Sequence, residues 1–192
     1  MSRLSVITLN KSILWSKDVA LRQKCRPIDV ENAEELAFAQ SLIREMFITL
    51  YTDPSGVALA APQIGALLQM VVINYEDKDV NEYRIMALIN PKITSLSDET
   101  NEEQEICLSV SNFSGKVIRS NSVEVEAFDQ HGSPIKFTAE GFFARVVQHE
   151  VDHLSGILCV DKGEKDKVNY IQEFPERNIE HVMRRLGLKK RD

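Results

Sequence analysis

The 192-residue chain has few cysteines and no long apolar run. Cys25, Cys107 and Cys159 are too few and too widely spaced for a disulfide framework, and an odd number would leave one unpaired. No uninterrupted apolar stretch approaches the ~20 residues that cross a bilayer, and the start, MSRLSVITLNKSILWSKD, lacks an apolar segment followed by a cleavage site. We therefore expect no membrane partner and a reducing compartment, either the cytoplasm or an organelle matrix.

Positive charge is also scarce, with 23 Lys and Arg against 29 Asp and Glu, a net charge of −6. This balance argues against a general nucleic-acid binder and predicts no DNA partner, because phosphate contacts depend on clustered cations. The exception is RRLGLKKRD, residues 184–192. Its cations either offset the negative end of a C-terminal helix dipole or form a docking patch for an acidic or RNA-rich partner.

The sequence has no internal repeat, low-complexity tract or evident linker. Its 43% hydrophobic and 27% charged residues are those of an ordinary soluble globular protein, which excludes the disordered and fibrous classes. A chain of this length can bury ~70% of its unfolded surface around one core. We therefore expect residues 1–192 to form one α+β domain.

Apolar spacing predicts the order of the elements. Residues 31–53 are predicted to form a helix that begins with an Asn32–Glu35 capping box and ends at the turn 53–56. Strands are predicted at 70–76 and 84–93, with a hairpin over 122–139 that turns near Gly132. A helix should start at Gly141, a buried strand should contain GILCV (156–160), and a basic amphipathic helix should cover about 176–190.

The segment QHEVDH, residues 148–153, contains the candidate metal ligands. On a helix His149 and His153 point the same way, so both rings can reach one ion ~2.1 Å away. Glu150 sits about 100° round that helix, where it can act on a metal-bound water as a general base. The apolar flanks FFARVV and LSGILCV indicate a buried helix, and buried His and Glu need partners that a metal would satisfy.

The spacing leaves the third ligand open. Cys159 lies where some zinc endopeptidases place a third histidine, and Gly156 matches the glycine of the same motif. Glu164 or Glu173 would complete a His₂Glu set, and Cys107 would make a soft site with an open fourth position. Cys159 has the alternative of being a buried core residue.

Three segments resemble the signatures of the peptide deformylases, in the order that the family has them. They are GVALAAPQIG (56–65), EICLS (105–109) and QHEVDH, and KDVALRQKCRPI (17–28) is similar to the family's N-terminal segment. The resemblance covers roughly residues 12–162. Three ordered motifs are far more specific than a single His–Glu–x–x–His.

The resemblance implies an antiparallel α+β fold around a metal-bearing helix, and an enzyme that removes the formyl group from nascent formyl-methionyl peptides. It implies Cys107, His149 and His153 as ligands of one divalent ion, Fe(II) in many members, with Zn, Ni or Co as alternatives. Glu150 would be the acid/base, and Gln63 and the Leu108 N–H would bind the substrate oxygen. The basic C-terminal helix would dock on the ribosome, as in some deformylases.

The resemblance also implies a pocket for the first side chain of the substrate. Its expected substrate-binding residues are Gly56, Val57, Ala58, Glu105, Ile106, Phe142, Arg145 and Val146. Arg145 should lay its stem along the pocket and keep its head in water. Ala58 and Ile106 replace glycines that are usual in the family. Alanine would cost ~1 kcal/mol at positive φ or crowd a bound peptide, and a β-branched residue beside the ligand cysteine would narrow the mouth.

The alternatives to an active deformylase are two. One is a divergent paralogue, with altered substrate or low activity, that binds peptide N-termini or the ribosome. The other is a zinc endopeptidase that uses Cys159 or Glu173 as the third ligand.

Overall fold

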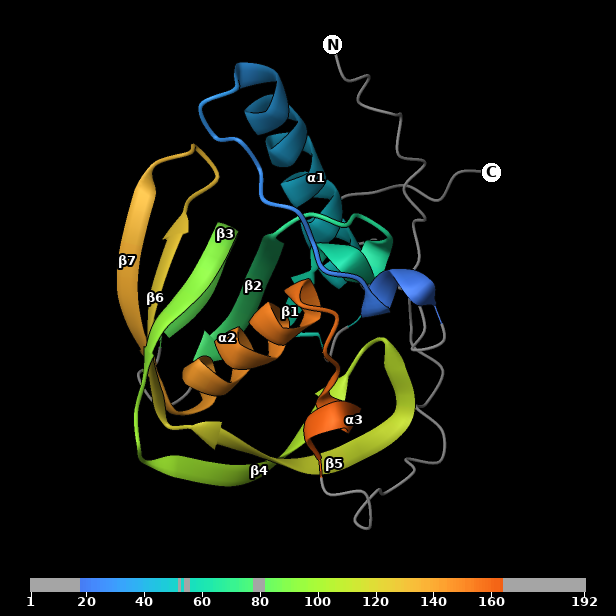
Figure 1. Cartoon of the computed structure of the whole chain (residues 1–192), viewed down its shortest axis with the longest axis vertical. Coiled ribbons are helices and arrows are strands. Elements are labelled where there is room, and N and C mark those ends of the chain that lie inside the picture. The colour runs from blue at the N-terminus through green and yellow to red at the C-terminus, as the bar shows by residue number, and fades with distance from the viewer. Residues whose placement is uncertain (1–17, 52, 54–55, 78–81, 164–192) are drawn as a thin grey trace.

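The computed structural model describes residues 18–51, 53, 56–77 and 82–163. Two antiparallel sheets and the helices packed on them confirm the predicted α+β class (Figure 1). The α-helices are α1 (Ala33–Tyr51), α2 (Gly141–Leu154) and α3 (Cys159–Lys162), and two 3-10 turns cover Val19–Arg22 and Ala61–Ile64. The strands are β1 (Ala58–Ala60), β2 (Met70–Asp77), β3 (Glu82–Leu96), β4 (Thr100–Cys107), β5 (Val110–Ser120), β6 (Ser122–Phe128) and β7 (Pro134–Glu140).

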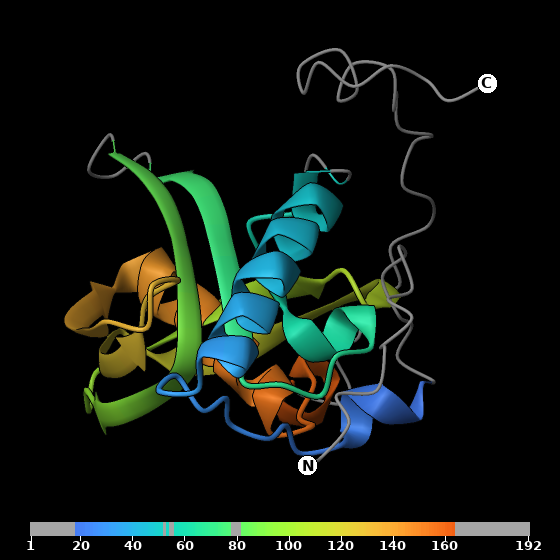
Figure 2. The same ribbon diagram turned by 90° about the horizontal axis from the view of Figure 1, so that it is seen from above.

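The larger sheet has the order β1-β2-β3-β6-β7 and is covered on both faces by helices (Figure 2). Val71 and Ile73 of β2 pack in the core that contains α2, whereas Met70 and Val72 pack in the core that contains α1. Successive side chains of a strand point to opposite faces, so a strand between two helical layers is apolar at every position. This explains why MVVI shows no polar alternation.

The start of α1 confirms the predicted cap but corrects the capping box. The Asn32 Oδ1 accepts hydrogen bonds from the Glu34 and Glu35 backbone N–H groups at 2.9 and 3.1 Å. The expected return bond from the Asn32 N–H to Glu35 is wrong, because that N–H donates to the Asp29 carbonyl at 3.2 Å. The Glu35 carboxylate accepts instead from the Asp29 N–H at 3.0 Å and from Arg26.

Two glycines set the limits of the metal-bearing helix α2, which begins at Gly141 as predicted. Gly141 has φ +54° and Gly156 has φ +75°, values that L side chains rarely adopt. A Cβ on Gly156 would also lie 2.7 Å from the Arg22 carbonyl carbon. The Gly156 that fitted an endopeptidase pattern is thus required by a turn and a close backbone contact.

The segment after Gly156 is a helix and not the expected strand. The Asp161 carboxylate accepts a hydrogen bond from the Leu158 N–H at 2.8 Å, which caps the short helix α3. Four apolar residues in a row do not distinguish a buried strand from a buried helical turn. The expected burial of Cys159 is confirmed, with 2% of the residue exposed.

The acidic run that precedes Cys107 forms most of β4, which pairs with β5 in a second sheet along one side of α2 (Figure 1). Glu105 and Cys107 are buried, whereas Gln104 and Ile106, which precede them in the strand, are exposed. The pairing register shifts between Ile106 and Cys107, where the hairpin turns. This alternation carries one carboxylate and one thiol of the second motif to α2.

The predicted helix 176–190 lies outside the described residues, and so do the alternative ligands Glu164 and Glu173. Among the described helices, none has both the length and the hydropathy to cross a membrane.

Candidate metal centre and active site

Three potential metal ligands converge from two elements that are distant in sequence. The ligand atoms of Cys107, at the end of β4, and of His149 and His153, on α2, all lie within 4.8 Å of one another. The Cys107 Sγ is 3.3 Å from the His153 Nε2. Sulfur and nitrogen ligands of one tetrahedral ion would be ~3.6 Å apart, given bond lengths of about 2.3 and 2.1 Å. The donor set and its spacing therefore fit one small divalent ion.

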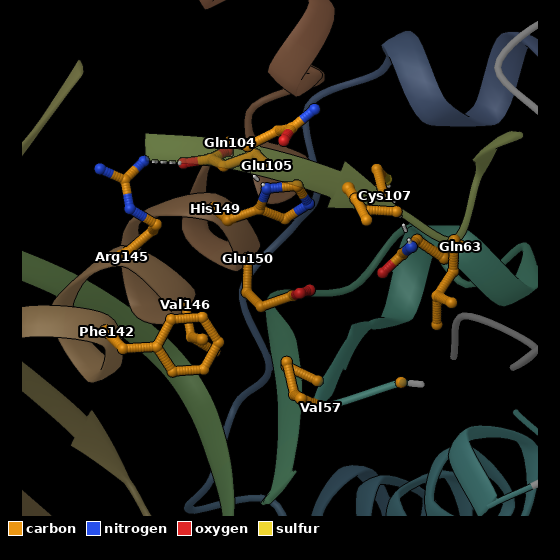
Figure 3. Close-up of a pocket in the computed structure, with 14 residues that line it drawn as sticks. Val57, Gln63, Gln104, Glu105, Cys107, Phe142, Arg145, Val146, His149 and Glu150 are labelled. Atoms are coloured by element: carbon orange, nitrogen blue, oxygen red, sulfur yellow. Dashed lines mark hydrogen bonds and ion pairs between the residues drawn. The ribbon is translucent and has the colours of Figure 1, made fainter. Parts of the chain in front are cut away.

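The ring of His149 is oriented by a buried carboxylate. Its Nδ1 lies 2.9 Å from the Glu105 Oε2, which leaves the Nε2 for the ligand cluster (Figure 3). A carboxylate behind a histidine fixes the tautomer and raises the basicity of the other nitrogen, as is usual for metal-binding histidines. Burial alone would lower the pKa of His149, but the hydrogen bond to Glu105 and the negative charges of Glu150 and Glu105 together outweigh it, and the pKa is raised.

Glu105 is itself held by two buried arginines. Its Oε1 accepts hydrogen bonds from the Arg119 Nε and the Arg145 Nη1, both at 2.8 Å, and its Oε2 accepts from the Arg119 Nη2 at 2.9 Å. Arg119 also pairs with Asp152 of α2. Burial would raise the pKa of Glu105, but the hydrogen bonds from Arg119 and His149 hold it well below the usual range. This network connects β4 and β5 with α2 beneath His149.

Two polar atoms beside the ligand cluster are buried without a hydrogen-bond partner in the described part of the protein. They are the Glu150 Oε2 and the His153 Nδ1. Unpartnered buried polar groups are costly, so a water held against Glu150 would relieve the first of them. Desolvation raises the pKa of Glu150 to about 7 and lowers the pKa of His153 well below its usual value. Glu150 can therefore accept and return a proton near neutral pH, and His153 is neutral, as a ligand must be.

Gln63 reaches the cluster from the 3-10 turn after β1. Its Oε1 accepts a hydrogen bond from the Ala60 N–H at 2.8 Å, and its Nε2 donates to the Ser109 hydroxyl at 3.1 Å. The same Nε2 is 3.9 Å from the Cys107 Sγ. These contacts fix the amide so that its N–H₂ group, and not its oxygen, faces the sulfur ligand.

One pocket of about 270 Å³ opens onto these groups (Figure 3). Its lining contains all the predicted site residues except His153. These are Gly56, Val57, Ala58, Gln63, Glu105, Ile106, Cys107, Leu108, Phe142, Arg145, Val146, His149 and Glu150, together with Gln104. His153 is only 1% exposed, and its Nε2 lies 3.3 Å from the Cys107 Sγ. The structure thus brings the predicted ligands, base and oxygen-binding groups to one cavity.

Comparisons with known proteins agree with this geometry. A family model of polypeptide deformylases matches residues 10–169. Peptide deformylase 2 of Clostridium acetobutylicum is 40% identical over 151 residues, 79% of this chain and 93% of that protein. The chain belongs to the peptide deformylase family.

Solved peptide deformylases share its fold. The structure of a peptide deformylase from Legionella pneumophila matches with a TM-score of 0.70 and 35% identity, and the match covers 92% of each chain. A class I type b peptide deformylase from Acinetobacter baumannii, solved with Met-Ala-Ser bound, matches with a TM-score of 0.68 and 29% identity. That match covers 78% of this chain and 96% of the other.

Ala58 and Ile106, which the resemblance suggested as replacements of glycines, have different surroundings. Ala58 is paired with Ile73 in β1, and Asn90 is the one described non-glycine residue with positive φ. The strain expected for alanine at positive φ is therefore absent at Ala58, and its methyl group lies against the pocket. Ile106 is 54% exposed and lines the pocket.

The expectation for Arg145 is corrected. Its side chain borders the pocket, but its guanidinium is buried, and the residue is 3% exposed. The Nη1 donates to Glu105 and to the Val117 carbonyl, and the Nη2 donates to the Asn101 carbonyl at 3.0 Å. A guanidinium can be buried where carboxylate and carbonyl acceptors meet its planar donors, and β4 and β5 supply them.

Several residues at the site were not identified from the sequence. They are Arg119, Ser109, Gln104 and Asp152. Ser109 belongs to the second motif, so that signal was present in the sequence. Arg119 comes from β5, and only the pairing of β5 with β4 brings it to Glu105.

Proposed function

We propose that this chain is a metal-dependent hydrolase that removes the N-terminal formyl group from nascent formyl-methionyl peptides and releases formate. Membership of the peptide deformylase family supports the reaction. The observation that carries the proposal is the placing of Cys107, His149 and His153 beside Glu150 in a pocket with an apolar side. A relative that only binds peptide ends would have no need of a buried carboxylate with a pKa of about 7.

Cys107, His149 and His153 would hold one divalent ion. A thiolate with two imidazoles suits Fe(II), which we propose for the cell, and Zn, Ni or Co would also fit. When bound, such an ion supplies the positive charge that makes a water acidic at neutral pH and polarises a carbonyl oxygen. Glu105, through its contact with the His149 Nδ1, would position that ligand.

The catalytic roles fall to three other groups. Glu150 would take a proton from the attacking water and then deliver it to the leaving amine, because its pKa lies near the working pH. The Gln63 Nε2 and the Leu108 backbone N–H would donate hydrogen bonds to the formyl oxygen as negative charge develops on it. Ser109 and the Ala60 N–H hold the Gln63 amide before substrate arrives, so little reorganisation is needed.

The apolar wall of the pocket would accept the methionine side chain. Phe142 and Val146 of α2 face the cavity opposite Val57, as Figure 3 shows. The Met-Ala-Ser peptide in the Acinetobacter baumannii structure supports a methionyl substrate. Gly56, Ala58, Glu105 and Ile106 would border the peptide backbone, with the Glu105 carboxylate occupied by its arginines and histidine. Arg145 would shape the wall from behind and contribute no free charge.

Formate release from a formyl-Met tripeptide tests the function. The protein should be purified without oxygen, loaded with Fe(II) or Ni(II), and measured beside Glu150→Ala. We expect turnover in the wild type and its near loss in the variant, with metal content unchanged in both. A protein that holds one metal and shows no turnover would refute the proposal and favour the divergent, binding-only paralogue.

The ligand set has its own test. Cys107→Ser should lose or exchange the metal, whereas Cys159→Ser should retain it. The opposite result would support the endopeptidase arrangement with Cys159 as a ligand.

A further inference from the structure

One exposed apolar side chain at the pocket lies outside the wall proposed for methionine. Ile106 is 54% exposed and lines the pocket. Among the large apolar residues that are exposed in the described part of the chain, only Ile106 and Phe142 line this pocket. Phe142 belongs to the methionine wall and packs edge-on against Tyr75, with ring centroids 5.4 Å apart. The role of Ile106 is therefore open.

Ile106 lies on the face of β4 opposite the ligand cysteine. Glu105 and Cys107 are buried, whereas Gln104 and Ile106 are exposed, because successive side chains of a strand point to opposite faces. Figure 3 shows Gln104, Glu105 and Cys107 along one side of the cavity, with Phe142 on another. A ligand beside β4 therefore meets an inner face with a carboxylate and a thiol, and an outer face with Gln104 and Ile106.

The pocket lies between two strands that each have an unpaired edge among the described strands. β4 pairs only with β5, and β1 is the last strand of the larger sheet. Both strands line the pocket, β1 through Ala58 and β4 from Gln104 to Cys107. An extended peptide can hydrogen-bond to such an edge as an added strand. Its formyl end has to lie at Cys107, so the peptide runs from there toward Gln104, antiparallel to β4.

We propose that Ile106 gives the enzyme a preference for an apolar second residue in its peptide substrate. The first and second side chains of an extended peptide point to opposite sides. Under the proposed function, on which this inference rests, the methionine side chain points toward Phe142 and Val146. The second side chain then points to the outer face of β4, where Ile106 lies. An apolar side chain there removes apolar surface of Ile106 from water, and serine covers less of it.

The size of the preference is limited because Ile106 lies at the surface. Contacts between neighbouring apolar side chains on one face of a sheet correspond to roughly 2–5-fold in kcat/KM. The third side chain of the peptide returns to the inner face, so it should not respond to the residue at position 106. The proposal thus assigns the effect to one position of the substrate.

The test measures kcat/KM of the Ni(II)-loaded full chain for formyl-Met-Leu-Ser, formyl-Met-Ser-Leu and formyl-Met-Ser-Ser. The first two peptides, each compared with the third, give the effect of leucine as the second or the third residue. Wild type is compared with Ile106→Ala and Ile106→Val. Ile118→Ala is the matched control, because Ile118 is 60% exposed on β5 and does not line the pocket. Thermal unfolding establishes that each variant is folded.

We expect the wild type to prefer formyl-Met-Leu-Ser to formyl-Met-Ser-Ser by roughly 2–5-fold. Ile106→Ala should bring this ratio close to one, Ile106→Val should retain most of it, and Ile118→Ala should retain all of it. The proposal is overturned if the wild type shows no preference, if Ile106→Ala keeps the wild-type ratio, or if Ile118→Ala loses it equally. An effect of Ile106→Ala on the third position alone would also overturn it.

A binding measurement separates this proposal from the proposed function. Protein labelled with ¹³C at its isoleucine δ-methyl groups is titrated, in the presence of Zn(II), with unformylated Met-Leu-Ser and Met-Ser-Ser. Ile106→Val identifies the methyl signal of Ile106. A larger shift of that signal with Met-Leu-Ser supports the contact, and absence of formate release would then refute deformylation alone. Equal shifts with the two peptides would overturn the contact at Ile106, whether or not formate is released.

Discussion

Replacing Glu105 with glutamine should destabilise both the fold and the metal centre. The Glu105 carboxylate accepts four hydrogen bonds, two from Arg119 and one each from Arg145 and His149. A glutamine side chain has the size of glutamate but no charge. Its N–H₂ group would face N–H donors that now bond to a carboxylate oxygen, so those hydrogen bonds would be lost. Breaking a buried ion pair costs about 3–5 kcal/mol, because the partner charges stay buried. For a chain of this size that loss lowers the melting temperature by roughly 6–20 °C.

The assay is thermal unfolding of the metal-free protein, followed by a chelator competition for Ni(II). Loss of the carboxylate behind His149 should weaken metal affinity about 10–100-fold. Glu102→Gln on the same strand is the matched control, because its ion pair with Lys116 is on the surface and contributes less than about 1 kcal/mol. If Glu105→Gln has the same melting temperature and Ni(II) affinity as Glu102→Gln, the hydrogen bonds of Glu105 do not organise this site.

The pH dependence of this effect has a definite sign. Burial would raise the pKa of Glu105, but Arg119 and His149 lower it overall. A carboxyl group with a lowered folded-state pKa stabilises the protein fully above its unfolded-state pKa, roughly 4.3, and loses that contribution as the pH falls through the folded-state value. Because Glu105 also raises the pKa of His149, the stability gap between wild type and Glu105→Gln should first widen as the pH falls through the titration range of His149, and should then narrow below the unfolded-state pKa of the carboxyl group. A gap that continues to widen below that carboxyl pKa would contradict the assigned direction.

Four further changes test other parts of the site. Glu150→Gln should lower kcat by about 10²–10⁴-fold with one metal still bound, and loss of the metal would contradict its role as a base. Gln63→Ala should lower kcat by about 10²–10³-fold, whereas Ser109→Ala, which only loosens the amide, should lower it less; equal effects would argue against an oxyanion role for Gln63. Ala58→Gly should lower the free energy of unfolding in urea by about 0.5–1 kcal/mol. Ala58 lies in a strand without backbone strain, so glycine relieves nothing there and only adds conformational freedom to the unfolded chain. Deletion of residues 184–192 should weaken co-sedimentation with ribosomes in a salt-sensitive way and leave tripeptide turnover unchanged; unchanged co-sedimentation would refute docking through the tail.

The parts predictable from the sequence were those with local signals. The apolar stripe of α2 and the i, i+4 spacing of His149 and His153 placed both rings on one face. The 122–139 hairpin was evident from its alternation and from the turn at Gly132, which has φ +79°. The helix α3 was missed because the Asp161 side chain, and not apolar spacing, determines that turn.

The long-range contacts had no such signal. The spacing did not decide between Cys107 and Cys159 as the third sulfur, and the preference for Cys107 came from the family resemblance. In the fold both cysteines are buried in one small cluster, and the ligand atom of Cys107, on the strand β4 that pairs with β5, lies within 4.8 Å of those of both histidines. Similarly, the acidic run gave no reason to single out Glu105, until strand alternation buried that one carboxylate against arginines from β5 and α2.

The charge distribution of the site follows from these long-range pairings. Arg119 and Arg145 pair with Glu105, which contacts the Nδ1 of His149. Glu150, next to His149 on α2, has no such ion pair in the described part of the protein, so desolvation raises its pKa to about 7 while that of Glu105 is lowered. Two buried carboxylates 45 positions apart in the numbering are thereby given different tasks, since a charged one orients a ligand and a protonatable one can transfer a proton. Replacing Arg119 or Arg145 should therefore weaken metal binding through His149 more than it changes proton transfer by Glu150.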